Sequence, residues 1–173
     1  VGAANVGSAI AYGADPLTER LHHVVREVFE HPTARVFPVT SGTAANALSL
    51  TAMCPPWGAV LCHATAHILN SEGGATSMLG GGTVMRGVAG DDFRVHPDGL
   101  HDAYAATRWG DPHHSQPRVL SLTQATDMGT IYSTGEIKDL AAIARERELR
   151  VHVDGARVAN AIVALDCSPA EMT

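Results

Sequence analysis

Short apolar segments that each lead into a helical pattern are the feature that most constrains the fold of this 173-residue chain. The segment "AVLC" is apolar throughout, which is typical of a strand buried on both faces of a parallel sheet. Further strand candidates with helical patterns between them are "TVMRGV", "RVLSLT" and "LRVHVD". Strands that alternate with helices predict an α/β fold: three layers, with helices on both faces of a mainly parallel sheet.

Capping residues mark where several of the helices should begin. Asp15 followed by Pro16 opens a helix whose apolar residues recur at helical spacing. Ser133 and Glu136 have the spacing of a capping box, and so do Ser168 and Glu171 near the end of the sequence. The other expected elements are a strand over 35–39 and helices over 44–53, 71–79 and 97–104.

The composition describes a globular protein with material for a core. Hydrophobic residues make up 45% and charged residues 17% of the chain, which is not the composition of a disordered chain. The net charge is -6 and no basic run occurs, which argues against nucleic acid or an anionic membrane as a partner. No apolar run approaches the about 18 residues that a membrane span needs. Three cysteines without CxxC spacing indicate reduced thiols, and therefore a cytoplasmic protein.

Polar clusters follow three of the expected strands, where each strand leads into the next helix. They read "TSGT", "HATAH" and "DGAR". In open sheets of parallel strands, ligands bind beyond the carboxyl ends of the strands. The three clusters therefore predict a single site at one edge of the sheet.

The first cluster places Ser41 and Thr43 on either side of Gly42, where a helix is expected to begin. Backbone N–H groups and hydroxyls at a helix N-terminus suit a phosphate. An ordinary helix cap uses the same residues, and the motif alone favours the cap. Neither the GxxxxGK[ST] pattern of a nucleotide P-loop nor a GxGxxG pattern after a strand is present.

The second cluster contains His63 and His67, whose spacing could place two imidazoles on one helical face, as in a metal site. The intervening residues, 64–66, offer no further ligand, and no HExxH pattern occurs. A histidine that stacks on a flat aromatic ligand is the favoured interpretation, and we expect no metal.

The third cluster brings Asp154 and Arg157 to the edge of a core, where a charge is costly unless it is paired. A local Asp154–Arg157 salt bridge is one interpretation. In the other, Asp154 binds a cation and Arg157 a carboxylate. The spacing alone favours neither interpretation.

Together the clusters offer a phosphate cradle, a ring-stacking histidine, an acid for a protonated nitrogen and a guanidinium for a carboxylate. Pyridoxal phosphate with an amino acid attached presents all four needs, because its pyridine nitrogen must stay protonated for the ring to accept electrons.

Five ordered blocks resemble the low-specificity L-threonine aldolases, which are pyridoxal phosphate enzymes of fold-type I with the aspartate-aminotransferase-like fold. The blocks are "AYGADPLTERL", "TSGTAANALSL", "HATAHILNSEGGA", "LTQATDMGTIYSTGEI" and "VHVDGARVANA". The ending "CSPAEMT" is also similar, so the resemblance covers nearly the whole chain.

The resemblance implies roles for individual residues. Ser41–Thr43 resembles the phosphate-binding segment, His67 the histidine stacked on the ring, and Glu72 a polar residue close to it. Asp154 resembles the partner of the pyridine nitrogen. Arg157 resembles an anchor of the cofactor phosphate or, as we expect, of the substrate carboxylate.

Two departures from the family pattern concern catalysis. Thr126 in "QATD" stands where some members have a histidine near the substrate hydroxyl. The only lysine, Lys138, lies on an expected exposed helix face, so the Schiff-base lysine is expected beyond Thr173. The resemblance therefore implies that residues 1–173 are part of the large domain, without an N-terminal segment, the Schiff-base lysine or the small domain.

The implied activity is retro-aldol cleavage of L-threonine, L-allo-threonine and related β-hydroxy-α-amino acids to glycine and an aldehyde, as in threonine catabolism and glycine biosynthesis. The alternatives are another fold-type I lyase, such as an amino-acid β-eliminating lyase, or a non-catalytic fragment. The resemblance also implies a homodimer or homotetramer.

Overall fold

The computed structural model describes residues 6–173. They fall into two compact units, one made of the residues up to Pro38 together with Cys167–Thr173, and the other of Val39–Asp166. Each unit is described by itself.

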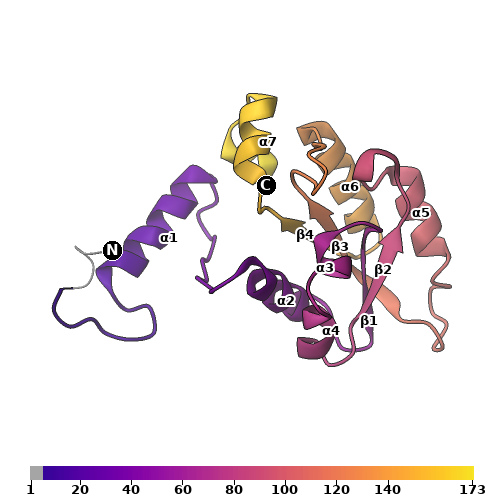
Figure 1. Cartoon of the computed structure of the whole chain (residues 1–173), viewed down its shortest axis with the longest axis horizontal. Coiled ribbons are helices and arrows are strands. Elements are labelled where there is room, and N and C mark those ends of the chain that lie inside the picture. The colour runs from indigo at the N-terminus through magenta and orange to yellow at the C-terminus, as the bar shows by residue number, and fades with distance from the viewer. Residues whose placement is uncertain (1–5) are drawn as a thin grey trace. The chain divides into compact units, whose positions relative to one another are not determined.

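The larger unit contains a four-stranded sheet in which all neighbouring strands are parallel. The strands are β1 (Gly58–His63), β2 (Val84–Val88), β3 (Gln116–Thr123) and β4 (Arg150–Asp154). Their order across the sheet is β2-β1-β3-β4 (Figure 1). Each of these strands was expected from its apolar pattern, and the α/β fold class is confirmed.

The helices of the larger unit alternate with the strands along the chain, and α2 precedes β1. They are α2 (Gly42–Met53), α3 (His67–Asn70), α4 (Ala75–Leu79), the 3₁₀ helix η2 (Asp91–Phe93), α5 (Pro97–Ala105), α6 (Thr134–Glu146) and α7 (Val158–Leu165). Among residues 6–173, no helix combines the length and the hydropathy that crossing a bilayer requires.

Successive residues of β1 enter different cores, because side chains alternate between the two faces of a strand. Leu61 packs in a core with Leu100 of α5 and Leu140 of α6. Val60 packs in a second core with Leu50 of α2. Helices therefore cover both faces of the sheet, with α5 and α6 on one side and α2 on the other (Figure 1), which confirms the expected three layers.

Helix α6 begins with the expected capping box. The Glu136 N–H donates to Ser133 Oγ at 3.2 Å, and the Ser133 N–H donates to Glu136 Oε2 at 2.7 Å. Arg94 Nη1 also donates to Glu136 Oε1 at 2.8 Å. The pKa of Glu136 is lowered, first by the backbone hydrogen bond from Ser133 and to a smaller extent by the charge of Arg94.

Two expected elements are wrong or only partly right. Residues 35–39 form no strand. The helix expected over 71–79 begins only at Ala75, because the preceding Gly73 and Gly74 adopt φ values of 58° and 75°. Those left-handed conformations suit glycine and break the helical path, so only the short helix α4 forms within the expected range.

The smaller unit contains α1 (Pro16–Val28) and the 3₁₀ helix η3 (Pro169–Met172). Asp15 caps α1 as expected, because its Oδ1 accepts hydrogen bonds from the N–H groups of Leu17 and Thr18, both at 3.0 Å. No residue of α1 is buried. The capping box of Ser168 forms as well, but the helix that it opens is 3₁₀.

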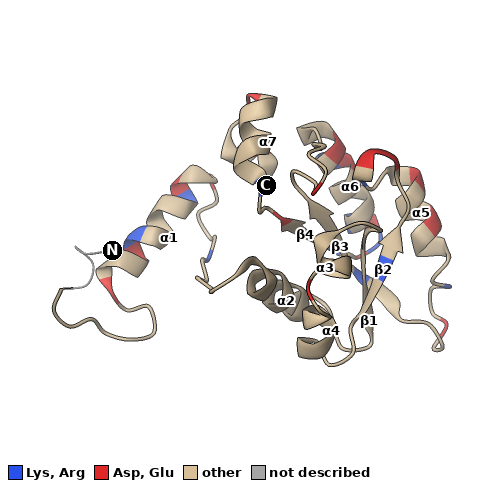
Figure 2. Cartoon of the chain, viewed as in Figure 1, with Lys and Arg blue, Asp and Glu red and all other residues tan. Residues whose placement is uncertain are grey.

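Figure 2 shows the Lys and Arg positions of the ribbon distributed over helices, strands and loops. The full chain has 12 Lys and Arg against 18 Asp and Glu.

Candidate functional site

Two of the three polar clusters, "HATAH" and "DGAR", lie where strands end, as the sequence predicts, whereas "TSGT" follows no strand because residues 35–39 form none. Asp154 is the last residue of β4, and it pairs in register with Thr123, the last residue of β3. His63 is the last residue of β1. Because the strands are parallel, these residues lie at one edge of the sheet.

Hydrogen bonds bring three of the predicted site residues together. Asn46 Nδ2 donates to Glu72 Oε1 at 2.8 Å and to Asp154 Oδ2 at 3.2 Å. His67 Nδ1 lies 3.0 Å from the same Glu72 Oε1. The result is a continuous network that runs from His67 through Glu72 and Asn46 to Asp154.

The sequence analysis missed Asn46, which connects this network. The residue lies one turn into α2, close to the turn at Ser41. A signal was present, because an amide among the small and apolar residues of a buried helix needs a partner. The residues of the network are distant in sequence, so the sequence around Asn46 does not identify its partners.

Asp154 is buried, with 8% of its surface exposed. Its Oδ1 accepts a hydrogen bond from the Ala156 N–H at 3.1 Å, and its Oδ2 accepts the one from Asn46. A carboxylate offers about four acceptor positions, so Asp154 retains capacity for one more donor.

Arg157 does not pair with Asp154, so the local salt-bridge interpretation is wrong. Its Nη2 lies 2.6 Å from Asp127 Oδ1, and its Nε donates to the Ala125 carbonyl at 3.0 Å. The side chain is 37% exposed. The guanidinium is thus held by the loop that follows β3, and Asp127 is a second partner that the sequence analysis did not name.

Thr126 lies in the same loop and is buried. Its Oγ1 lies 2.7 Å from Thr130 Oγ1 and accepts a hydrogen bond from the Thr130 N–H at 3.1 Å. These contacts close the turn between the two threonines. The Thr126 hydroxyl thus bonds to Thr130 within its own loop.

Ser41 caps α2, because its Oγ accepts a hydrogen bond from the Ala44 N–H at 3.2 Å. Ser41 and Gly42 are exposed and Thr43 is half-buried. The first N–H groups of a helix have no carbonyl partner within the helix, so those that the cap does not use can meet an anion.

His63 and His67 do not share a helical face, because His63 ends β1 and His67 begins α3. The ring nitrogens of His63 lie 2.8 Å from Thr65 Oγ1 and 3.2 Å from the Gly90 carbonyl oxygen. In the described part of the chain, no cluster of three or more His, Cys, Asp or Glu side chains could hold a metal ion.

A buried histidine lies next to the network. His152 precedes Asp154 by two positions, so both side chains project from the same face of β4. Its Nδ1 lies 2.8 Å from Ser121 Oγ. Burial lowers the pKa of His152, against the opposing effect of the negative charges of Asp154 and Glu72.

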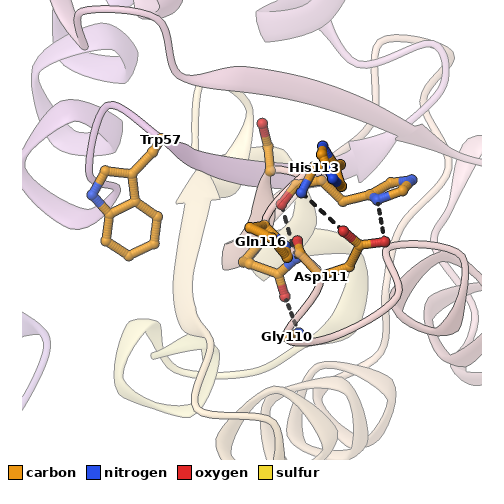
Figure 3. A pocket seen from close by; sticks show the side chains of 8 residues that line it. Trp57, Gly110, Asp111, His113 and Gln116 are labelled. Atoms are coloured by element: carbon orange, nitrogen blue, oxygen red, sulfur yellow. Dashed lines mark hydrogen bonds and ion pairs between the residues drawn. The ribbon is translucent and has the colours of Figure 1, made fainter.

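A separate pocket of about 390 Å³ lies near the amino ends of β1 and β3, away from Asp154 (Figure 3). Its polar groups largely bond to one another: the Gly110 N–H donates to Gln116 Oε1, and the His113 N–H donates to Asp111 Oδ1. The lining residues are Trp57, Gly110, Asp111, Pro112, His113, His114, Ser115 and Gln116. None of the residues predicted for the site lines this pocket.

Comparisons with known proteins identify the family of the chain. The profile of the family described as "Beta-eliminating lyase" matches residues 1–173. The chain is 39% identical over 170 residues to the low specificity L-threonine aldolase of Pseudomonas aeruginosa, and 30% identical over 174 residues to that of Escherichia coli K12. These alignments cover 98% and 99% of this chain, but 48% and 49% of the relatives. The chain thus spans about half the length of the curated relatives that it matches.

Solved structures share the fold. A threonine aldolase from Leishmania major superposes with a TM-score of 0.92 at 25% identity, over 99% of this chain and 49% of that one. A structure from Exiguobacterium, described as a putative aromatic amino acid beta-eliminating lyase/threonine aldolase, superposes with a TM-score of 0.72 at 22% identity, over 98% of this chain and 46% of that one.

Proposed function

The chain belongs to the beta-eliminating lyase family, and from this premise we propose that the whole protein is a pyridoxal phosphate-dependent threonine aldolase. It cleaves L-threonine, L-allo-threonine and related β-hydroxy-α-amino acids to glycine and an aldehyde. The observation that carries the proposal is the buried Asp154 carboxylate, which is joined through Asn46 and Glu72 to His67 at the carboxyl edge of the sheet.

The residues present fit pyridoxal phosphate. None of the ion pairs of residues 6–173 includes Asp154, although an acid at the edge of a core needs a partner. A protonated ring nitrogen would supply one. The N-terminus of α2 at Ser41–Thr43 suits the phosphate, and the His67 side chain is 44% exposed, so its ring is accessible. When bound, the cofactor supplies an electron sink for the bonds at the substrate's α-carbon.

Each side chain then has a stated task. Asp154 holds the proton on the ring nitrogen. Arg157 binds the substrate carboxylate, with its guanidinium oriented by Asp127 and the Ala125 carbonyl. Glu72 accepts a hydrogen bond from His67 Nδ1–H, which leaves Nε2 free to face the ligand. Thr126 contributes to the substrate side of the site through the turn that it closes.

The reaction removes the proton of the β-hydroxyl and breaks the bond between the α- and β-carbons. The electron pair of the O–H bond forms the carbonyl of the aldehyde, and the α-carbon keeps the pair of the broken bond and takes up a proton to give glycine. Fixing the carboxylate with Arg157 limits rotation of the substrate, so the same bond is presented for cleavage in every turnover. His67 assists the proton transfer.

The remaining features of the whole protein are proposals too. Residues 1–173 form part of the large domain, and the Schiff-base lysine lies outside them, because Lys138 is exposed on α6, away from the network. The whole protein acts in the cytoplasm as a homodimer or homotetramer, and it serves threonine catabolism and glycine biosynthesis.

The test is an assay of the purified full-length protein with added pyridoxal phosphate. L-Threonine and L-allo-threonine should yield glycine and acetaldehyde. Formation of pyruvate and ammonia from tryptophan or another amino acid, without glycine from the threonines, would instead support a β-eliminating lyase. Borohydride treatment of the 173-residue chain with the cofactor should leave no adduct on Lys138.

A further inference from the structure

Asn46 donates hydrogen bonds from its side-chain amide to two carboxylates. Its Nδ2 atom lies 2.8 Å from Glu72 Oε1 and 3.2 Å from Asp154 Oδ2. An amide nitrogen carries two hydrogens, so each carboxylate receives one. All three residues are buried.

Two buried carboxylates that share one nitrogen lie close together. Like charges disfavour each other's ionised form, and loss of water strengthens the effect, so such pairs tend to take up a shared proton. Among residues 6–173, no Lys or Arg forms an ion pair with either one. The nearby titratable groups are His67, which contacts Glu72, and His152, which feels both negative charges.

The other oxygen of Glu72 has no donor to offset its burial. Glu72 Oε2 is buried and has no hydrogen-bond partner in the described part of the chain, and the side chain is 1% exposed. Glu72 therefore depends on Asn46 and His67 for donors, and both reach it at Oε1.

We propose that Asn46 is a positioning residue that holds Glu72 and Asp154 in place by donating one amide hydrogen to each carboxylate. Without Asn46, the two acids would face each other with no donor between them, and Asp154 would lose the contact that orients it. Insofar as it concerns the cofactor, the inference rests on the proposed function: a displaced Asp154 would be less able to hold the ring nitrogen protonated.

The first experiment needs no cofactor. Thermal unfolding of the chain is compared for wild type, Asn46→Leu, Glu72→Gln and the double variant at about pH 8 and at about pH 4.5, which is near the ordinary pKa of a carboxyl group. Asn46→Leu should lower the melting temperature more at the higher pH, where the unbridged acids repel each other. In the Asn46→Leu background, Glu72→Gln should raise the melting temperature at the higher pH, because it removes one charge and restores an amide donor.

Controls separate this effect from packing. Glu72→Gln in the wild-type background measures how much stability is lost when His67 and His152 no longer interact with the negative charge of Glu72. Asn160→Leu makes the same chemical change at an exposed position of α7 and should show no pH-dependent loss. If Asn46→Leu does not fold, Asn46→Asp replaces it, with the same expected rescue by Glu72→Gln.

The second experiment uses the full-length protein with pyridoxal phosphate labelled with ¹⁵N in the ring. The ring ¹⁵N shift should move toward that of neutral pyridine in Asn46→Leu and return toward the wild-type value in the double variant. A loss of stability that is equal at both pH values, or a Glu72→Gln change that adds to the loss, would overturn the inference. Failure of the wild type to bind the cofactor would count against the proposed function and leave the first experiment as the deciding one.

Discussion

Arg157 Nη2 lies 2.6 Å from Asp127 Oδ1, so the guanidinium of the "DGAR" turn is directed to the loop after β3 and not to Asp154. Asp154 is bound to Asn46 and to the Ala156 N–H instead. The two charges of the turn therefore serve separate partners. Asp127 holds Arg157 at a partly exposed position, where an incoming carboxylate can reach it.

Replacing Arg157 by lysine should weaken substrate binding more than it slows the chemistry. Lysine keeps the charge but loses the planar fork that binds a carboxylate through two parallel hydrogen bonds. In the full-length enzyme, we expect KM for L-threonine to rise about 10-fold, which corresponds to about 1.4 kcal/mol. Steady-state kinetics will measure it. Arg147→Lys, at an exposed position at the end of α6, is the matched control and should leave KM unchanged.

Replacing Asp154 by asparagine should reduce turnover and leave the fold intact. The amide has nearly the same shape and can still accept a hydrogen bond from Asn46, but it has no charge to hold a proton on a ring nitrogen. A fall in kcat of about 100-fold or more is expected, the scale of losing one preorganised electrostatic contact of about 3 kcal/mol. Turnover close to that of the wild type would contradict the role assigned to Asp154. Asp139→Asn, on the exposed side of α6, is the control.

The sequence predicted the fold well where the signals were local. Short segments rich in apolar residues located all four strands of the sheet, and the capping box at Ser133 located the start of α6. The failures came from segments in which propensity and context disagreed. Residues 35–39 have a strand-like composition but contain Pro38, which lacks an N–H group, and the structure pairs them with no strand.

The sequence predicted that several candidate residues would gather at one edge of the sheet, and it predicted their contacts only in part. The carboxyl edge followed from the topology rule for parallel sheets, and His67 and Asp154 do join one network there. The two connecting partners, Asn46 and Asp127, were missed. Both pair with residues that are distant in the sequence, so their roles depend on how the helices and loops pack, which a single sequence does not encode locally.

The three thiols should differ in reactivity. Burial raises the pKa of Cys54, and it raises the pKa of Cys62 to about 12, so both remain protonated and shielded at neutral pH. Cys167 is half-buried. Titration with a chromogenic disulfide should show one fast thiol in the native chain and the other two only after denaturation. Cys167→Ser should abolish the fast phase, and rapid labelling of all three cysteines would contradict the burial described for the larger unit.

His152 should make the chain less stable as the pH falls. Because burial lowers its pKa in the folded state, the unfolded chain binds a proton at this residue at a higher pH than the folded chain does. Stability from a neutral His152 is therefore fully present above the unfolded pKa of about 6.5 and declines as the pH falls below it. Denaturant unfolding between about pH 7.5 and about pH 5.5 should show a smaller decline for His152→Gln, by a fraction of a proton in the linkage slope.

The comparison of slopes isolates this residue, since every other titratable side chain is the same in both proteins. His101→Gln, at an exposed position of α5, provides the matched control and should keep the wild-type slope. Equal slopes for wild type and His152→Gln would mean that the folded chain protonates His152 as readily as the unfolded chain does. In that case, the attraction of Asp154 and Glu72 for the imidazolium would offset the whole cost of burying it.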